Sequence, residues 1–196
     1  MNQILSDIKK YPVIAAIRDI DDVDTALSRD IQCIFLLTGS ILNLRYVVQC
    51  IKKSRKRAFL HIDLVDGISK DSEGTKYIAE EIRPDGIITT RSNLALCARS
   101  LGLFTIQRVF ILDSLAVDTA VKAISKVEPD AVEILPGVLT KTLRKVASTV
   151  KPPIIAGGLI ETEEEVKTRL GFGGQLLFLL QEKVCGIVAR LISENS

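Results

Sequence analysis

The sequence predicts an α/β protein built as a TIM-like (β/α)8 barrel, with seven clear βα units and an atypical eighth. Short β-branched apolar runs alternate with amphipathic helical stretches along the chain, and the runs are apolar almost throughout. Strands of this kind are buried on both faces, as in parallel sheets covered by helices. A doubly wound sheet usually has a glycine-rich first βα turn, but Ile17-Arg18-Asp19-Ile20 contains no glycine.

Seven apolar runs are expected to form strands: Val13–Ile17, Cys33–Thr38, Ala58–Leu64, Gly86–Thr90, Thr105–Leu112, Ala131–Leu135 and Ile154–Ala156. Seven stretches are expected to form helices: Asp21–Arg29, Leu44–Ser54, Asp71–Ile82, Leu94–Leu101, Leu115–Lys126, Thr140–Thr149 and Thr162–Leu170. Local signals agree with these bounds. Gly102 suits the end of a helix, and Pro84, Pro129 and Pro152-Pro153 each precede a predicted strand.

The composition favours one domain over residues 1–196 and excludes a polyelectrolyte. The chain has 196 residues, 47% of them hydrophobic, with 26 basic and 24 acidic side chains. This length supports one substantial core. Because the overall charge is nearly balanced, any binding of nucleic acid must depend on a local basic patch.

The cysteines and the N-terminus predict a cytoplasmic protein without a membrane partner. The four cysteines are far apart and form no C-x-x-C pair: Cys33, Cys50, Cys97 and Cys185. We therefore expect free thiols, with no metal and no cofactor. Asp7, Lys9 and Lys10 lie where a signal peptide needs an apolar stretch, and no run is long enough to span a membrane. The sequence does not indicate the oligomeric state.

Polar residues gather where the predicted strands end, which is where (β/α)8 barrels carry their chemistry. They are Arg18, Thr38-Gly39, His61, Asp63, Thr89, Thr90, Arg91, Ser92, Gln107, Arg108, Asp113, Glu133, Gly157 and Gly158. Packing alone does not explain polar groups at one end of otherwise apolar strands. We therefore predict a ligand site at this end of the barrel.

Two pairs in this set have both a functional and a structural interpretation. His61 and Asp63 share a face of their predicted strand, so they could recognise a hydroxyl, act as acid and base, or form half of a metal site. They could equally be a structural hydrogen-bonded pair. The backbone N–H groups of Gly157 and Gly158 could approach a phosphate, or the glycines could serve only a tight turn. Gly137, after Leu135-Pro136, is mainly typical of a turn.

The one local basic cluster lies in a helix-to-strand connection, on the rim opposite the predicted ligand site. It contains Lys52, Lys53, Arg55, Lys56 and Arg57. It is either a solvated loop or a contact for the phosphate backbone of RNA. No lysine lies at a predicted strand end, which argues against a Schiff-base aldolase.

Five blocks in fixed order give a more specific interpretation. They are HIDLVDGI from His61, GIITTRS from Gly86, QRVFILD from Gln107, EILPG from Glu133 and PIIAGGLI from Pro153. Together they resemble the glycerol-3-phosphate-responsive antiterminator family over about 170 residues. The resemblance implies a TIM-like barrel without enzymatic activity. Such a protein binds glycerol-3-phosphate and acts on the mRNA leader of the glycerol operon, permitting read-through of a terminator.

The resemblance also implies roles for single residues. Gly157 and Gly158 would hold the phosphate of the ligand. From their places at the strand ends, we infer that the rest of the pocket is lined by Arg18, His61, Asp63, Thr89, Thr90, Arg91, Arg108, Glu133 and Gly137. A ligand that binds one conformer better would shift the population toward the form that acts on RNA.

The resemblance stops near Gly171, which makes 172–196 an atypical segment. The family continues with a strand of small and hydroxyl residues, where this chain has large apolar ones such as Leu176–Leu180. With suitable synonymous codons, a shifted frame from Gly174 spells AVAVSTS and then a Leu-Trp pair. We therefore hypothesise a frameshift between Gly171 and Gly174; a divergent genuine C-terminus is the alternative.

This C-terminal segment has consequences for the fold and for ligand binding. Leu176–Leu180 is expected to fill the eighth strand position, and Ile187–Ile192 could add a helix. A large leucine or phenylalanine would crowd the phosphate, so we expect impaired ligand binding.

Three functions are compatible with these observations. The first is a glycerol-3-phosphate-sensing RNA-binding regulator, which the resemblance favours. The second is a TIM-barrel enzyme of the isomerase or phosphodiesterase type, with His61, Asp63 or Glu133 as acid and base on a small phosphorylated substrate. The third is the inactive product of a decayed gene.

Overall fold

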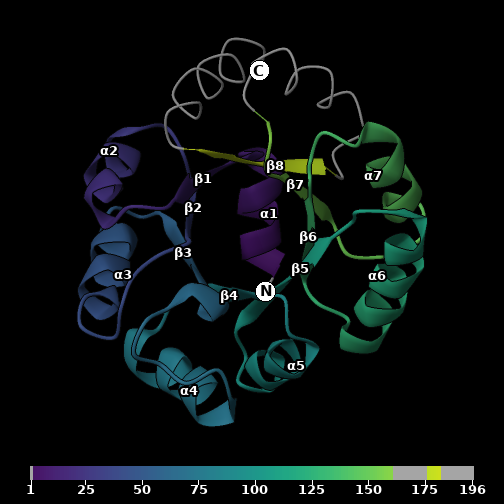
Figure 1. The fold of residues 1–196 in the computed structure, drawn as a ribbon. Helices are drawn as coiled ribbons and strands as arrows, with labels where there is room; N and C mark the ends of the chain where they lie inside the picture. The colour runs from purple at the N-terminus through teal and green to yellow at the C-terminus, as the bar shows by residue number, and fades with distance from the viewer. Residues whose placement is uncertain (1, 161–175, 182–196) are drawn as a thin grey trace.

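The computed structural model describes residues 2–160 and 176–181, which form a closed barrel of eight parallel strands (Figure 1). The strands follow one another around the barrel in chain order. They are β1 (Val13–Ile17), β2 (Cys33–Leu36), β3 (Arg57–His61), β4 (Gly86–Thr89), β5 (Phe104–Phe110), β6 (Ala131–Leu135), β7 (Ile154–Gly157) and β8 (Leu176–Gln181). The predicted TIM-like barrel is confirmed.

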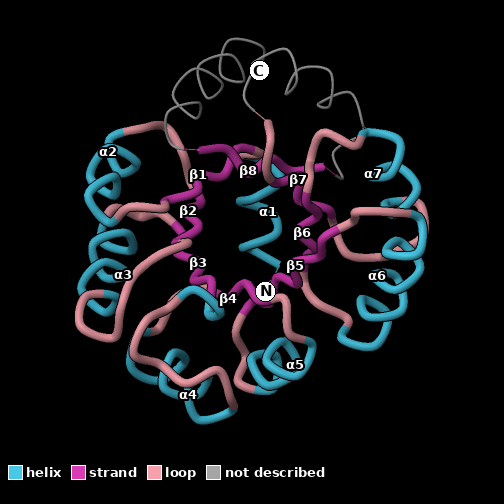
Figure 2. The backbone as a smooth tube through the Cα atoms, viewed as in Figure 1, coloured by secondary structure: helices cyan, strands magenta, loops and turns pink. Residues whose placement is uncertain are grey.

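Helices surround the barrel (Figure 2). They are α2 (Val23–Ser28), α3 (Leu44–Lys53), α4 (Ser72–Tyr77), α5 (Ser92–Ser100), α6 (Ser114–Val127) and α7 (Thr140–Ala147). Two 3-10 turns, η1 (Ile20–Asp22) and η2 (Ile62–Leu64), and a π-helical segment, η3 (Ile78–Ile82), complete the connections. The helices predicted over Thr162–Leu170 and Ile187–Ile192 lie outside the described residues.

The strand bounds agree with the prediction except near the C-terminal ends of some strands. β1 and β6 have the predicted bounds, and β8 fills the predicted eighth position by pairing with β1 and β7. The largest difference is at β3, which ends at His61 because the next three residues turn into η2. Asp63 therefore lies on a 3-10 turn. The prediction that it lies on the strand with His61 is wrong.

One helix, α1 (Asn2–Lys10), was not predicted. Figures 1 and 2 show α1 within the ring of strands. Ile8 on this helix is fully buried in the interior cluster, and Ile4 and Leu5 pack against the same cluster. The isoleucines at 4 and 8 have the spacing of one helix face, so this signal was available in the sequence. The helix closes the N-terminal end of the barrel and leaves the other end to the candidate site.

An ion-pair chain fixes α1 to the barrel. Arg57, the first residue of β3, places Nη2 2.9 Å from Asp7 Oδ2 of α1. Its Nη1 lies 3.1 Å from Asp85 Oδ1, just before β4. One guanidinium therefore ties the helix to two neighbouring strands.

Three phenylalanines form the centre of the barrel interior. Phe59 packs edge to face against Phe35, with ring centroids 5.3 Å apart, and against Phe104, with centroids 5.7 Å apart. Cys33 lies in the same cluster as a free thiol. A second apolar cluster fills the space between the strands and the outer helices. Among the described residues, no helix is both long and apolar enough to cross a membrane.

Candidate functional site

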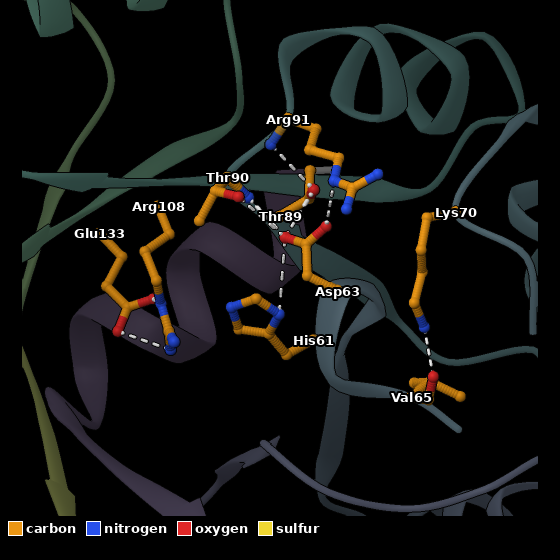
Figure 3. Close-up of polar contacts among 9 residues, drawn as sticks. All are labelled: His61, Asp63, Val65, Lys70, Thr89, Thr90, Arg91, Arg108 and Glu133. Atoms are coloured by element: carbon orange, nitrogen blue, oxygen red, sulfur yellow. Dashed lines mark hydrogen bonds and ion pairs between the residues drawn. The ribbon is translucent and has the colours of Figure 1, made fainter.

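The C-terminal ends of the strands bring the predicted polar residues together at the mouth of the barrel (Figure 3). The interior positions of each strand follow from the alternation of side chains. Phe59, Ile106, Ala131 and Ile155 belong to the interior cluster. The residues two positions further along these strands therefore point into the mouth, and they are His61, Arg108, Glu133 and Gly157.

Arg108 and Glu133 form a buried ion pair at the centre of this mouth. They lie opposite each other in the register of β5 and β6. Arg108 Nε donates to Glu133 Oε2 at 2.7 Å, and Nη2 donates to Oε1 at 3.0 Å. Arg108 is 7% exposed and Glu133 is fully buried. Burial raises the pKa of Glu133, whereas the charge and hydrogen bonds of Arg108 act in the opposite direction and favour the carboxylate.

Asp63 organises the second polar group at the mouth. Its Oδ2 accepts hydrogen bonds from Thr89 Oγ1 at 3.0 Å, from Thr90 N at 2.8 Å and from Thr90 Oγ1 at 3.2 Å. Arg91 Nε lies 3.3 Å from Asp63 Oδ1. The turn after β3 is thereby fixed to the end of β4, and the half-exposed guanidinium of Arg91 stands at the edge of the mouth.

His61 lies between these two groups and is 2% exposed. Its Nδ1 is 3.8 Å from Asp63 Oδ2, too far for a hydrogen bond, and has no hydrogen-bond partner within the described residues. Burial and the charge of Arg108 lower the pKa of His61 to about 4, although Asp63 opposes them. His61 is therefore neutral at pH 7, with a buried ring nitrogen free to bond to a ligand.

The neutral state of His61 predicts a loss of stability in mild acid. Its pKa is about 4 in the folded protein, against 6.5 for an unperturbed imidazole, so the unfolded chain takes up the proton first. The free energy of unfolding should fall as the pH decreases from 6.5 to 4, by up to about 1.4 kcal/mol per pH unit from this group. Urea denaturation across this range measures the slope.

The matched control for this pH effect is His61→Asn. The chain has one histidine, so the difference between the two slopes isolates His61 from the carboxylates. Equal slopes in the wild-type chain and the variant would contradict the prediction.

The glycines at the mouth pack closely against other groups. A Cβ on Gly157 would lie 2.7 Å from Glu133 Oε1. Gly158 has φ of 73°, in the left-handed region. Gly137 N donates to Gly157 O at 2.6 Å, and a Cβ on Gly137 would lie 2.9 Å from Gly157 N. Gly157 thus has a packing reason to be glycine that does not depend on a phosphate.

Gly157→Ala is expected to destabilise the fold by about 1–3 kcal/mol, because the new methyl group overlaps a carboxylate that Arg108 holds in place. Urea denaturation measures this change. Ala156→Gly at the neighbouring position removes a methyl group and serves as the control for altering this strand. A Gly157→Ala variant as stable as the wild-type chain would show that Glu133 can move aside.

Some predicted residues do not join the central group. Arg18 follows β1 and is exposed at the rim. Gln107 points away from the barrel interior, and its Nε2 donates to Ser92 Oγ at 3.1 Å. Asp113 caps α6 by accepting a hydrogen bond from Ala116 N at 2.8 Å. Among the described residues, no group of three or more His, Cys, Asp or Glu side chains could hold a metal ion.

Lys70 near the mouth was not identified from the sequence. It lies in the loop after η2, and its ammonium donates to the carbonyl of Val65 (Figure 3). Burial lowers the pKa of Lys70, whereas the charges of Asp63 and Asp66 raise it. Lys70 lies in a loop and not at a strand end, so the pattern of polar residues at the strand ends does not include it.

The basic cluster lies on the opposite rim, as predicted, but it is not one surface. Lys56 is buried, and its Nζ donates to the carbonyls of Arg29 and Ile31, each at 2.6 Å. Arg57 is engaged by Asp7 and Asp85, as described above. The exposed part of the cluster is therefore Lys52, Lys53 and Arg55.

Comparisons with known proteins identify the family. A family model for the glycerol-3-phosphate responsive antiterminator matches residues 13–177. An uncharacterized protein of Escherichia coli (strain K12), YgcP, is 35% identical over 170 residues, which cover 87% of this chain and 89% of that protein.

Two solved structures are similar along most of the chain. The glycerol uptake operon antiterminator regulatory protein of Listeria monocytogenes has a TM-score of 0.81 and 34% identity, covering 85% of this chain and 90% of the other. A glycerol uptake operon antiterminator-related protein of Thermotoga maritima has a TM-score of 0.79 and 30% identity, covering 92% and 98%. The chain belongs to the glycerol-3-phosphate responsive antiterminator family.

Proposed function

We propose that the protein is a cytoplasmic regulator that senses glycerol-3-phosphate at the barrel mouth and binds RNA to permit read-through in glycerol uptake genes. Membership of the antiterminator family supports this proposal, as do the names of the two similar solved structures. The single observation that carries it is that the buried Nδ1 of His61, beside the Arg108–Glu133 pair, has no hydrogen-bond partner among the described residues.

Glycerol-3-phosphate has the chemistry that these groups would recognise. Its two hydroxyls can bond to His61 Nδ1 and to the carboxylates of Asp63 or Glu133. Its phosphate would lie near Gly157 and Gly158, because backbone N–H groups at the end of a late barrel strand can donate to an anion. Four more residues are proposed at the ligand from their position around the mouth: Arg18, Thr89, Thr90 and Gly137, with Arg91 and Arg108 supplying positive charge.

The ligand would act by a shift of population. A ligand with higher affinity for one conformer of the mouth increases the fraction of that conformer. Arg108 and Glu133 are buried and joined by two hydrogen bonds, so we expect the conformational difference in the loops that follow the strands. These loops connect the mouth to the outer helices.

Calorimetric titration with glycerol-3-phosphate tests the ligand, with glycerol and inorganic phosphate as the partial ligands. His61→Ala should weaken glycerol-3-phosphate binding by about 10–100-fold, because a buried hydrogen bond is lost. Asp113→Asn is the matched control, since Asp113 is a polar residue of the same rim that only caps α6. Equal affinities for His61→Ala and the wild-type chain would reject this site.

Binding to RNA needs a separate test. A transcript of the glycerol-operon leader should bind with an affinity that falls steeply with salt concentration, since phosphate contacts release counterions. Glycerol-3-phosphate should change this affinity. No binding at low salt, with or without glycerol-3-phosphate, would reject the regulator.

The atypical C-terminal segment leads to a further part of the proposal. We expect weaker ligand binding than in a chain with the shifted frame restored, because large side chains would replace small ones near the phosphate. The family match ends at residue 177, within β8. The genomic sequence across codons 168–196 tests the frameshift. Calorimetry that compares the affinity of this chain for glycerol-3-phosphate with that of the chain in the restored frame tests its effect. Tight glycerol-3-phosphate binding by this chain would contradict impairment.

The enzyme alternative has less support at this site. A histidine with a pKa of about 4 is a weak general base at neutral pH, and Glu133 is held by Arg108. Turnover of a phosphorylated glycerol compound that His61→Ala abolishes would reverse this preference.

A further inference from the structure

We propose that RNA binds the N-terminal face of the barrel, opposite the ligand mouth, along a basic groove between α3 and η3. This inference rests on the function proposed above and names the surface that the function needs.

The groove between α3 and η3 has a volume of about 550 Å³. Figure 1 draws α3 next to α4, which η3 continues. The charged residues that line it are Arg45, Lys52, Lys53, Glu80, Glu81 and Arg83. Arg45 pairs with Glu81, whereas Lys52 donates to the carbonyl of Arg83. Within the described residues, Lys52, Lys53 and Arg83 form no ion pair, so their charges remain available to an anion.

Two arginines beside the groove have an unfavourable backbone conformation. Arg55, just after α3, has φ of 59°, and Arg83, just after η3, has φ of 56°. At the equivalent position after α5 the chain has a glycine, Gly102, with φ of 77°. A left-handed residue at a helix end is usually glycine, because other side chains raise its energy. Glu128, after α6, has the same conformation with φ of 50°, so the two arginines differ from it in their charge and not in their backbone.

Within the part of the chain that the structure describes, the exposed charges of the two barrel faces differ in their balance. Exposed cations lie at the helix ends and connections of the N-terminal face: Lys10, Arg29, Lys52, Lys53, Arg55, Arg83, Arg99, Lys126 and Lys151. The exposed acids of that face are fewer: Asp30, Glu80, Glu81 and Glu128. Among the described residues, the rim of the ligand mouth and the first helical turns beside it carry seven exposed acids against four exposed cations. The acids are Asp19, Asp21, Asp24, Asp66, Asp71, Glu73 and Asp113, and the cations are Arg18, Arg45, Arg91 and Lys141. A polyanion is therefore attracted more strongly to the N-terminal face than to the rim of the mouth.

This placement separates the two ligands by the length of the barrel. Glycerol-3-phosphate and RNA would then not compete for one site. Each would change the affinity for the other only through the conformation of the barrel and its helices, and the effect must be reciprocal. A variant of the RNA surface should consequently keep its affinity for glycerol-3-phosphate.

The double variant Arg55→Gly with Arg83→Gly tests the surface, because it removes two cations and relieves two strained backbones. Glu128→Gly is the matched control: Glu128 follows α6 with φ of 50° and carries the opposite charge. Fluorescence anisotropy with a labelled transcript of the glycerol-operon leader measures Kd between 50 and 200 mM salt. Calorimetry on the same preparations measures glycerol-3-phosphate binding.

The double variant should raise Kd for RNA about tenfold. The slope of log Kd against log salt concentration should decrease by about 1.4, or about 0.7 for each lost phosphate contact. Glu128→Gly should leave Kd unchanged or lower it, and both variants should unfold at or above the wild-type temperature. If the double variant binds RNA with the wild-type Kd, the proposed RNA surface is wrong and the proposed function stands. A wild-type chain that binds no transcript would overturn the proposed function as well.

Discussion

Glu133→Ala is expected to lower the free energy of unfolding by about 3–5 kcal/mol, because it leaves the guanidinium of Arg108 buried without its partner. Arg108 is 7% exposed, and two of its hydrogen bonds go to this carboxylate. The truncation also leaves an empty space where three strands meet, since Gly157 of β7 lies against the same side chain. Denaturation with urea and with heat measures the loss.

The control for this variant removes both charges. Arg108→Met combined with Glu133→Leu replaces the pair with apolar side chains of similar length, which is often neutral or stabilising. The double variant should regain most of the stability lost in Glu133→Ala. It should not regain glycerol-3-phosphate binding, because the polar centre of the mouth is gone. A double variant as unstable as Glu133→Ala would show that the pair contributes through its specific hydrogen bonds.

Phe59→Ala is expected to cost about 3–5 kcal/mol of folding free energy. Phe59 is fully buried, and its ring contacts those of Phe35 and Phe104 edge to face. Its truncation opens a cavity in the middle of a closed barrel, where the surrounding strands have little freedom to collapse. Phe110→Ala is the matched control, because Phe110 is 53% exposed at the end of β5 and should change stability by less than about 0.5 kcal/mol. Similar losses in the two variants would contradict this view of the core.

The barrel could be predicted from the sequence because its strands are uniformly apolar and its helices are amphipathic. β1 and β6 have the predicted bounds, and each has a proline at one end, Pro12 before β1 and Pro136 after β6. The end of β3 could not be predicted, because Ile62-Asp63-Leu64 continues the alternation of the strand and has no glycine or proline to mark the turn. Asp63 fixes that turn by accepting hydrogen bonds from Thr89 and Thr90, a contact between distant residues.

The sequence predicted which residues lie at the strand ends, but it did not predict which of them contact one another. Alternation along β3, β5 and β6 places His61, Arg108 and Glu133 inside the barrel, yet only the register of β5 with β6 pairs the last two. The basic cluster shows the same limit. Lys56 and Arg57 look like surface charges in the sequence. In the structure Lys56 is buried and donates to the carbonyl of Ile31, and Arg57 forms an ion pair with Asp7. Such partners depend on the tertiary fold and leave no local pattern.

Helix α1 has a practical consequence for anyone who expresses a shortened form of this protein. The family match begins at Val13, so a truncation at that boundary would remove the whole helix. Water would then reach the phenylalanine-rich interior through the N-terminal end of the barrel. Arg57 would lose its ion pair with Asp7 and keep the one with Asp85. Helix α1 thus closes the N-terminal end of the barrel, and a shortened protein must retain it to keep the interior packed.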